Sequence, residues 1–172
     1  CGGAGGEPHL QLVAGLVRDI AREDGLNFRL AMIHAEQEKR YVKDRLAQGR
    51  VKPLNGHAPL EQDTVDKAER IVGMMGPEPF IRALDSGAQV VLAGRSSDPA
   101  SFAATIMRAQ LPPAQAWYAG KMLECGATPS VPKGHDCLFV TVDQESVTCE
   151  PTNPARKCTP LSIATHTRPL PE

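Results

Sequence analysis

The start of the chain has the hydrophobic spacing of an amphipathic helix. Positions 13, 16, 17 and 20 are Val, Leu, Val and Ile, and the charged residues between them fall on the opposite side of a helix. Pro8 suits a first helical turn and Gly25 suits a stop. The almost continuous apolar run from Phe28 to Ile33 then predicts a short strand that is covered on both faces.

The same alternation of helix and strand recurs further along. We expect a short helix over residues 80–86, ended by Gly87, and a buried strand over 88–93. That strand leads directly into a turn at Gly94, after which Asp98 is expected to cap a helix that reaches about residue 109. Further helices are predicted over residues 36–48, 65–72 and 117–124.

The last third of the chain has a different pattern. Two β-rich runs, 137–142 and 146–149, are separated by a short polar turn and predict a β-hairpin. The Pro-rich remainder from residue 151 is expected to be mostly loop.

These patterns predict an α/β protein with a mostly parallel sheet flanked by helices and a C-terminal β-hairpin. Residues 1–127 are expected to form the α/β core with a ligand crevice at the strand ends, and residues 128–172 a Pro-rich segment that carries the hairpin. The chain begins with Cys1 rather than Met, inside a glycine cluster. We therefore expect it to be a fragment of a longer α/β protein.

Composition narrows the classes of function. The formal charge is −1, so the chain as a whole does not attract nucleic acid electrostatically. Aromatic residues make up only 4% of the chain, so surfaces on which bases could stack are not expected either. The apolar runs are too short to cross a bilayer, and no leader opens the chain, so a cytoplasmic protein without membrane contact is predicted. Five cysteines, an odd number without metal-type spacing, favour free thiols.

The strand-to-helix turn after residue 93 is the strongest candidate for a ligand site. Ligands of open α/β sheets collect at the carboxyl ends of strands, and helix starts attract anions. Arg95 offers a two-pronged donor for a carboxylate or phosphate, and the neighbouring candidates are Gly94, Ser96, Ser97 and Asp98. The alternative is an ordinary turn in which Asp98 is a cap and Arg95 forms a surface salt bridge.

The glycine cluster before the first helix is the second candidate. Its glycines, Gly2, Gly3, Gly5 and Gly6, would let backbone amides approach an anion closely. The dinucleotide fingerprint fails because Pro8 stands where its third glycine is required. A nonstandard ligand loop and a plain tight turn both remain open. If both loops end strands of one sheet, we expect them to face the same crevice.

Two pairs of side chains are candidates for proton transfer. His34 directly follows a predicted strand, and Glu36 lies two residues further on. Lys121 and Glu124 lie one turn apart on a predicted helix. The alternatives are a loop-capping His34 and a surface ion pair over a buried Cys125. No metal site is predicted, because the adjacent residues 135–137 would point to opposite faces of a strand.

Several segments together resemble the acyclic terpene utilisation AtuA-type family, and the similarity spans nearly the whole chain. They are Gly-Gly-Ala-Gly-Gly6, Ile33-His-Ala-Glu36, residues 70–76, residues 83–98, residues 119–127 and residues 158–166. The resemblance implies an intracellular protein of pathways that degrade branched, terpenoid-type acids as coenzyme A thioesters. It also implies an α/β portion before the glycine cluster, which agrees with the expectation that this chain is a fragment of a longer protein. It implies neither a reaction nor a cofactor.

Two functional hypotheses follow. In the first, the protein binds a small carboxylate or an acyl-CoA at the strand-end loops; whether it also acts on that ligand as an enzyme stays open. In the second, it is a noncatalytic subunit or scaffold that binds a partner enzyme of the same pathway. A homo-oligomer is compatible with either hypothesis, and a nucleotide-binding module is disfavoured by the failed fingerprints.

Overall fold

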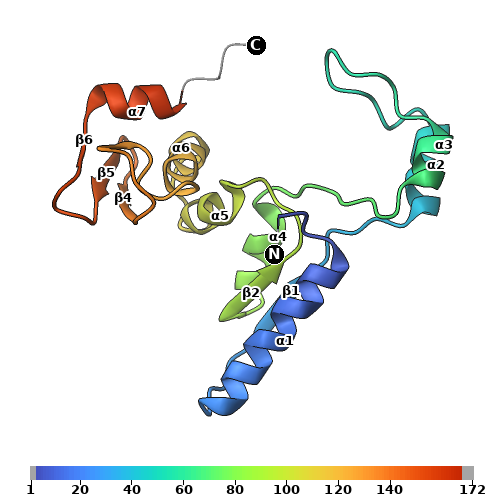
Figure 1. Cartoon of the computed structure of the whole chain (residues 1–172), viewed down its shortest axis with the longest axis horizontal. Helices are drawn as coiled ribbons and strands as arrows, with labels where there is room; N and C mark the ends of the chain where they lie inside the picture. Colours follow the sequence, from blue (N-terminus) through green and yellow to red (C-terminus); the bar gives the residue numbers. More distant parts are fainter. Residues whose placement is uncertain (1–2, 168–172) are drawn as a thin grey trace. The chain divides into compact units, whose positions relative to one another are not determined.

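The computed structural model in Figure 1 describes residues 3–167. The contacts within the chain divide it into two compact units. Unit 1 comprises the chain up to Met75 together with Ala83–Ser96, and unit 2 comprises Gly76–Arg82 together with the residues from Ser97 onward. Helix α4 (Glu78–Asp85), which the sequence predicts, crosses from unit 2 to unit 1. The division of the chain after residue 127 stays a prediction.

Unit 1 is built around two parallel strands and one long helix. Strands β1 (Leu30–Ile33) and β2 (Val90–Ala93) pair in parallel, and α1 (Glu7–Glu23) packs along them (Figure 1). The predicted helix and both predicted strands form, but the expectation that the strands are buried is wrong, because all residues of β1 and β2 are only partly buried. The inward face of α1 is Leu10 and Ala14, which are fully buried, whereas Leu16 and Ile20 remain more than half exposed. A two-stranded sheet covers only a narrow stripe of the helix.

The second part of unit 1 corrects two predicted helix boundaries. Helix α2 (Lys39–Ala47) begins three residues later than predicted, and α3 (Gln62–Lys67) ends five residues before Val72. Glu36 and Val72, both expected in helices, instead face each other in an isolated antiparallel bridge. The Gln37 N–H donates to the Ile71 carbonyl at 2.8 Å. Long-range backbone pairing therefore overrides the local helical pattern at both positions.

Unit 2 contains a tightly packed helix pair, α5 (Ala100–Arg108) and α6 (Pro113–Leu123). Small residues allow the close approach, and five of them are fully buried: Ala100, Ala103, Ala104, Ala116 and Ala119. A Cβ at Gly120 would lie 2.6 Å from the Pro99 carbonyl oxygen. The predicted cap at Asp98 is wrong, because α5 begins at Ala100 with Pro99 in the N-cap position.

The C-terminal hairpin of unit 2 is confirmed. Strands β4 (Leu138–Val142) and β5 (Val147–Pro151) pair antiparallel, and α6 packs against them. The Asp143 carboxylate closes the turn by accepting the Glu145 and Ser146 N–H groups, both at 2.8 Å.

The segment after this hairpin is more regular than expected. Strand β6 (Lys157–Cys158) pairs with β3 (Ser130–Val131), and α7 (Pro160–Thr167) follows. The start of α7 is closed by reciprocal bonds, since the Thr159 N–H donates to Ser162 Oγ and the Ser162 N–H donates to Thr159 Oγ1. The expectation of a loop was therefore wrong. Two-residue strands are too short to show a hydrophobic period.

The fold class α/β is confirmed, but the mostly parallel sheet is not. Within residues 3–167 the strands form three two-stranded sheets, of which β1–β2 is parallel and the other two are antiparallel. No helix in that range combines the length and apolar composition needed to cross a bilayer.

Candidate functional site

The two loops proposed to bind a ligand meet at the carboxyl ends of β1 and β2. Gly5 has a φ of +64°, and a Cβ there would lie 2.2 Å from the backbone nitrogen of Arg95. A Cβ at Gly94 would lie 2.6 Å from that of Ala35 and 2.7 Å from the Gly5 carbonyl oxygen. The glycines therefore allow two backbones to stack in direct contact. No space is left between the loops at Gly5, so a ligand would lie on their outer side, where Gly3 is exposed.

Arg95 lies at the edge of this stacked pair. Its Nη1 donates to the Gly3 carbonyl oxygen at 3.4 Å, and its Nη2 lies 4.0 Å from Met74 Sδ. Its carbonyl oxygen accepts the Met75 N–H at 3.2 Å, and Ser96 pairs with Met75 in a parallel bridge. The guanidinium is thus held beside the glycine loop.

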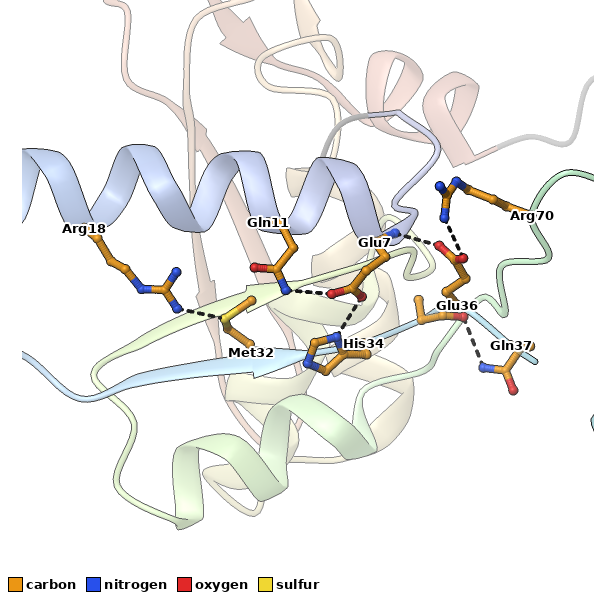
Figure 2. Close-up of polar contacts among 9 residues, drawn as sticks. Glu7, Gln11, Arg18, Met32, His34, Glu36, Gln37 and Arg70 are labelled. Atoms are coloured by element: carbon orange, nitrogen blue, oxygen red, sulfur yellow. Dashed lines mark hydrogen bonds and ion pairs between the residues drawn. The ribbon is translucent and has the colours of Figure 1, made fainter.

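His34 forms a close pair with a carboxylate, but its partner is Glu7 (Figure 2). Its Nδ1 lies 2.7 Å from Glu7 Oε2, while Gln11 donates to Glu7 Oε1, also at 2.7 Å. The hydrogen bonds from Gln11 and then His34 hold the pKa of Glu7 below its ordinary value. An ionised Glu7 makes Nδ1 the donor, so we assign the lone pair of the neutral ring to Nε2. The His34 side chain is 55% exposed, which leaves the ring accessible.

Glu36 connects three parts of unit 1. Its Oε2 accepts the Glu7 N–H at 2.9 Å, at the start of α1, and its Oε1 accepts Arg70 Nη1 at 2.8 Å (Figure 2). The positive end of the α1 dipole is therefore occupied by a carboxylate of the same chain. With both oxygens engaged, the geometry favours a supporting role for Glu36 over proton transfer.

Glu7 is the member of this cluster that sequence reasoning missed. In the sequence, a Glu at the start of a helix indicates only a favourable interaction with the helix dipole. The available signal was topological: a helix that follows the glycine loop and packs along β1–β2 brings its first turn to the strand end that carries His34.

The second proposed pair lies in unit 2. Lys121 on α6 forms an ion pair with Glu124, the residue that caps the end of this helix, and the Glu124 side chain is 8% exposed. The hydrogen bond to Glu124 is the main reason that the pKa of Lys121 is raised, and Asp98 adds to it electrostatically. A raised pKa keeps Lys121 charged at neutral pH, so it suits charge stabilisation better than proton abstraction. Cys125, expected to be buried, is exposed.

The structure thus separates the proposed site residues into two groups. Unit 1 holds His34 and Glu36 together with Gly3, Gly5, Gly6, Gly94, Arg95 and Ser96. Unit 2 holds Ser97, Asp98, Lys121 and Glu124. Gly2 lies outside the described residues. Within residues 3–167, no group of three His, Cys, Asp or Glu side chains is placed to hold a metal ion.

Unit 2 also contains two adjoining open cavities beside the hairpin. Their volumes are about 290 and 330 Å³, and both are lined by Tyr118 and Val147. Cys149 and Cys158 line the smaller cavity, where burial and then the neighbouring Cys158 raise the pKa of Cys149 to about 11. Burial also raises the pKa of Cys158.

We expect Cys149 to resist alkylation at pH 8. Because only the thiolate reacts, a pKa of about 11 instead of 9.0 lowers the reactive fraction by about 100-fold. The sign follows from burial, which disfavours the charged form, so reactivity should rise only as the pH approaches 11. Peptide mapping after timed iodoacetamide treatment measures this, with the exposed Cys125 and Cys137 as internal controls. Equal labelling of all three would contradict the burial of Cys149.

Comparison with known proteins yields one family. The family described as acyclic terpene utilisation family protein AtuA matches residues 4–130. No curated protein and no solved structure matches the chain.

Proposed function

The chain belongs to the acyclic terpene utilisation family AtuA, and we propose that it binds a carboxylate or acyl-CoA thioester at the carboxyl ends of β1 and β2 and transfers a proton on it. The observation that carries this proposal is the His34–Glu7 pair, which lies at the strand ends in the same unit as Arg95. A histidine oriented by a carboxylate is a common device for proton transfer.

The mechanism uses the chain's own groups. The lone pair on His34 Nε2 takes a proton from the carbon next to the thioester carbonyl, and the electrons of the broken C–H bond move to the carbonyl oxygen. Glu7 fixes the ring through Nδ1 and stabilises the imidazolium that forms. The Arg95 guanidinium stabilises the negative charge that develops on the oxygen.

The neighbouring contacts hold these groups in position. Glu36 ties the backbone of Glu7 to Arg70, which fixes the start of α1 against the segment after β1. The glycine loop holds Arg95 by direct backbone contact. The roles of Ser97, Asp98, Lys121 and Glu124 in unit 2 stay predictions.

Replacing Arg95 by alanine should weaken binding of an acyl thioester by about tenfold or more, since a hydrogen bond to a charged group contributes roughly 1.5–3 kcal/mol. Isothermal titration calorimetry with the CoA thioester of a branched acid measures the change. Arg18→Ala is the matched control, because Arg18 also contacts a methionine sulfur, Met32 Sδ at 3.4 Å, from the surface of unit 1. Unchanged affinity in Arg95→Ala would reject Arg95 as a residue that hydrogen-bonds the bound thioester.

A second candidate function is a noncatalytic subunit that binds a partner enzyme through the hairpin and the segment after it. Exposed apolar side chains in this part of unit 2 favour it: Phe139 is 60% exposed and Leu161 74%. A strictly monomeric species by native mass spectrometry, together with turnover of an acyl thioester, would count against it.

A further inference from the structure

Two arginines and a tyrosine line one open cavity in unit 1. The cavity has a volume of about 370 Å³ and is lined by Gln37, Tyr41, Val42, Arg45, Arg50 and Val51. Its size falls in the range of small-ligand pockets. These residues belong to α2 and the chain on either side of it, and none of them is a residue of the proposed strand-end site.

Among residues 3–167, no acidic side chain pairs with either guanidinium group. Arg45 Nη1 contacts only a neutral acceptor, Gln48 Oε1 at 3.4 Å, and the Arg50 side chain has no polar partner within the described part of the chain. The dipole of α2 favours a cation in its last turn, which accounts for Arg45. It does not account for Arg50, which lies beyond the helix after Gly49. Two uncompensated positive charges on one cavity favour a phosphate group, which arginine binds through paired donors.

The remaining lining residues suit a flat aromatic base. The Tyr41 ring is held by Arg45, whose Cζ lies 4.9 Å from the ring centroid, and the residue is 50% exposed. Exposed aromatic rings stack on nucleobases. Val42 and Val51 supply apolar edges. Gln37 donates its Nε2 to the Ala35 carbonyl at 3.1 Å, which turns its Oε1 into the acceptor for an exocyclic amine such as that of adenine.

We propose that this cavity binds an adenosine phosphate, with the phosphate on Arg45 and Arg50 and the base on Tyr41. Gln37 also borders the strand-end cluster, next to Glu36 (Figure 2). If the strand-end site takes a CoA thioester, as in the proposed function, this cavity holds the nucleotide end of the same ligand. This link to the CoA thioester rests on the proposed function, whereas the binding of an adenosine phosphate to the cavity is independent of it.

Calorimetry with adenosine 3′,5′-bisphosphate tests the proposal on the full chain. Arg50→Gln and Arg45→Gln should each weaken binding by about tenfold or more, because each removes a charge-assisted contact. Arg40→Gln is the matched control, because Arg40 lies on α2 but does not line the cavity. The affinity of this variant for the bisphosphate should equal that of the wild type. Tyr41→Leu should reduce the affinity for the bisphosphate while leaving that for inorganic phosphate unchanged.

The other outcomes are decisive as well. No binding of the bisphosphate, or equal losses in the Arg40 and Arg50 variants, would overturn the site. If inorganic phosphate binds as tightly as the bisphosphate, the cavity does not recognise the base. If a single-stranded oligonucleotide binds more tightly than the bisphosphate, the ligand of the cavity is nucleic acid and not a mononucleotide. His34→Gln should leave bisphosphate binding unchanged, so failure of this proposal is distinguishable from failure of the strand-end function. Arg50→Glu, at the same exposed position, provides a second variant whose repulsion should abolish binding.

Discussion

Alanine at Gly5 is expected to destabilise unit 1 by more than about 3 kcal/mol, near the upper end for single substitutions. Two separate effects act there. The φ of +64° lies in the left-handed region, which a residue with a Cβ rarely adopts, and the added Cβ would lie 2.2 Å from the Arg95 nitrogen. That neighbour is backbone, so it moves only if the turn after β2 moves. The variant should therefore separate the glycine loop from Arg95.

Two other glycines distinguish the backbone strain of a positive φ from the steric clash of an added Cβ. Gly25 has nearly the same φ, +63°, with nothing within 4 Å, so Gly25→Ala should cost only about 1–2 kcal/mol. Gly15 lies inside α1 with open space around it, so Gly15→Ala should stabilise by about 0.5–1 kcal/mol. Hydrogen exchange at the Gly94 amide, which donates to the Ile33 carbonyl at 2.8 Å, reports on unit 1. Equal effects at Gly5 and Gly25 would show that the loop does not rest on Arg95.

Replacing His34 by glutamine is expected to slow proton exchange next to a bound thioester carbonyl by at least about 100-fold, the lower range for a general base. Glutamine keeps a polar side chain near Glu7 but cannot accept a proton at neutral pH. Proton NMR in D₂O with the CoA thioester of a branched acid measures the exchange directly, without knowledge of the later steps. An unchanged exchange rate would reject His34 as the base.

Glu7→Gln tests the partner of His34 separately. The amide can donate as well as accept, so it no longer fixes Nδ1 as the donor. The exchange rate should fall less than in His34→Gln, and nitrogen NMR of the ring should show a mixture of tautomers. His57→Gln is the control, because His57 lies in the segment between α2 and α3. Loss of rate without any change of tautomer would contradict the positioning role of Glu7.

Periodicity predicted the long elements because the spacing and turn residues that define each of them lie within a short stretch of sequence. The helix after Pro8, the strands that end at Ile33 and Ala93, and the C-terminal hairpin all follow from spacing and turn residues. The two misplaced helix boundaries share one cause. Glu36 and Val72 leave their predicted helices because they pair with each other across 36 residues, and such partners are not visible in a local window.

The position of the candidate residues was more predictable than their pairing. If both loops end strands of one sheet, the sequence predicts that they face one crevice; in the structure the loops touch, with no space between them at Gly5. The sequence left open whether the glycine loop binds a ligand or is a plain turn, and it did not indicate that the Glu36 carboxylate accepts the Glu7 N–H at the start of α1 or that Glu7 pairs with His34. The cavity with Arg45 and Arg50 was missed because only the net charge of the whole chain was weighed, and a local pair of cations does not appear in that sum.

One titration tests the central claim most directly. Nitrogen NMR of the histidine rings, recorded as the CoA thioester of a branched acid is added, follows His34 at its own resonance. We predict that His34 carries its proton on Nδ1 before any ligand is added, and that its Nε2 signal shifts saturably with ligand while those of His9 and His57 stay in place. A His34 ring protonated on Nε2, or one that does not respond at saturating ligand, would contradict a thioester site at the carboxyl ends of β1 and β2.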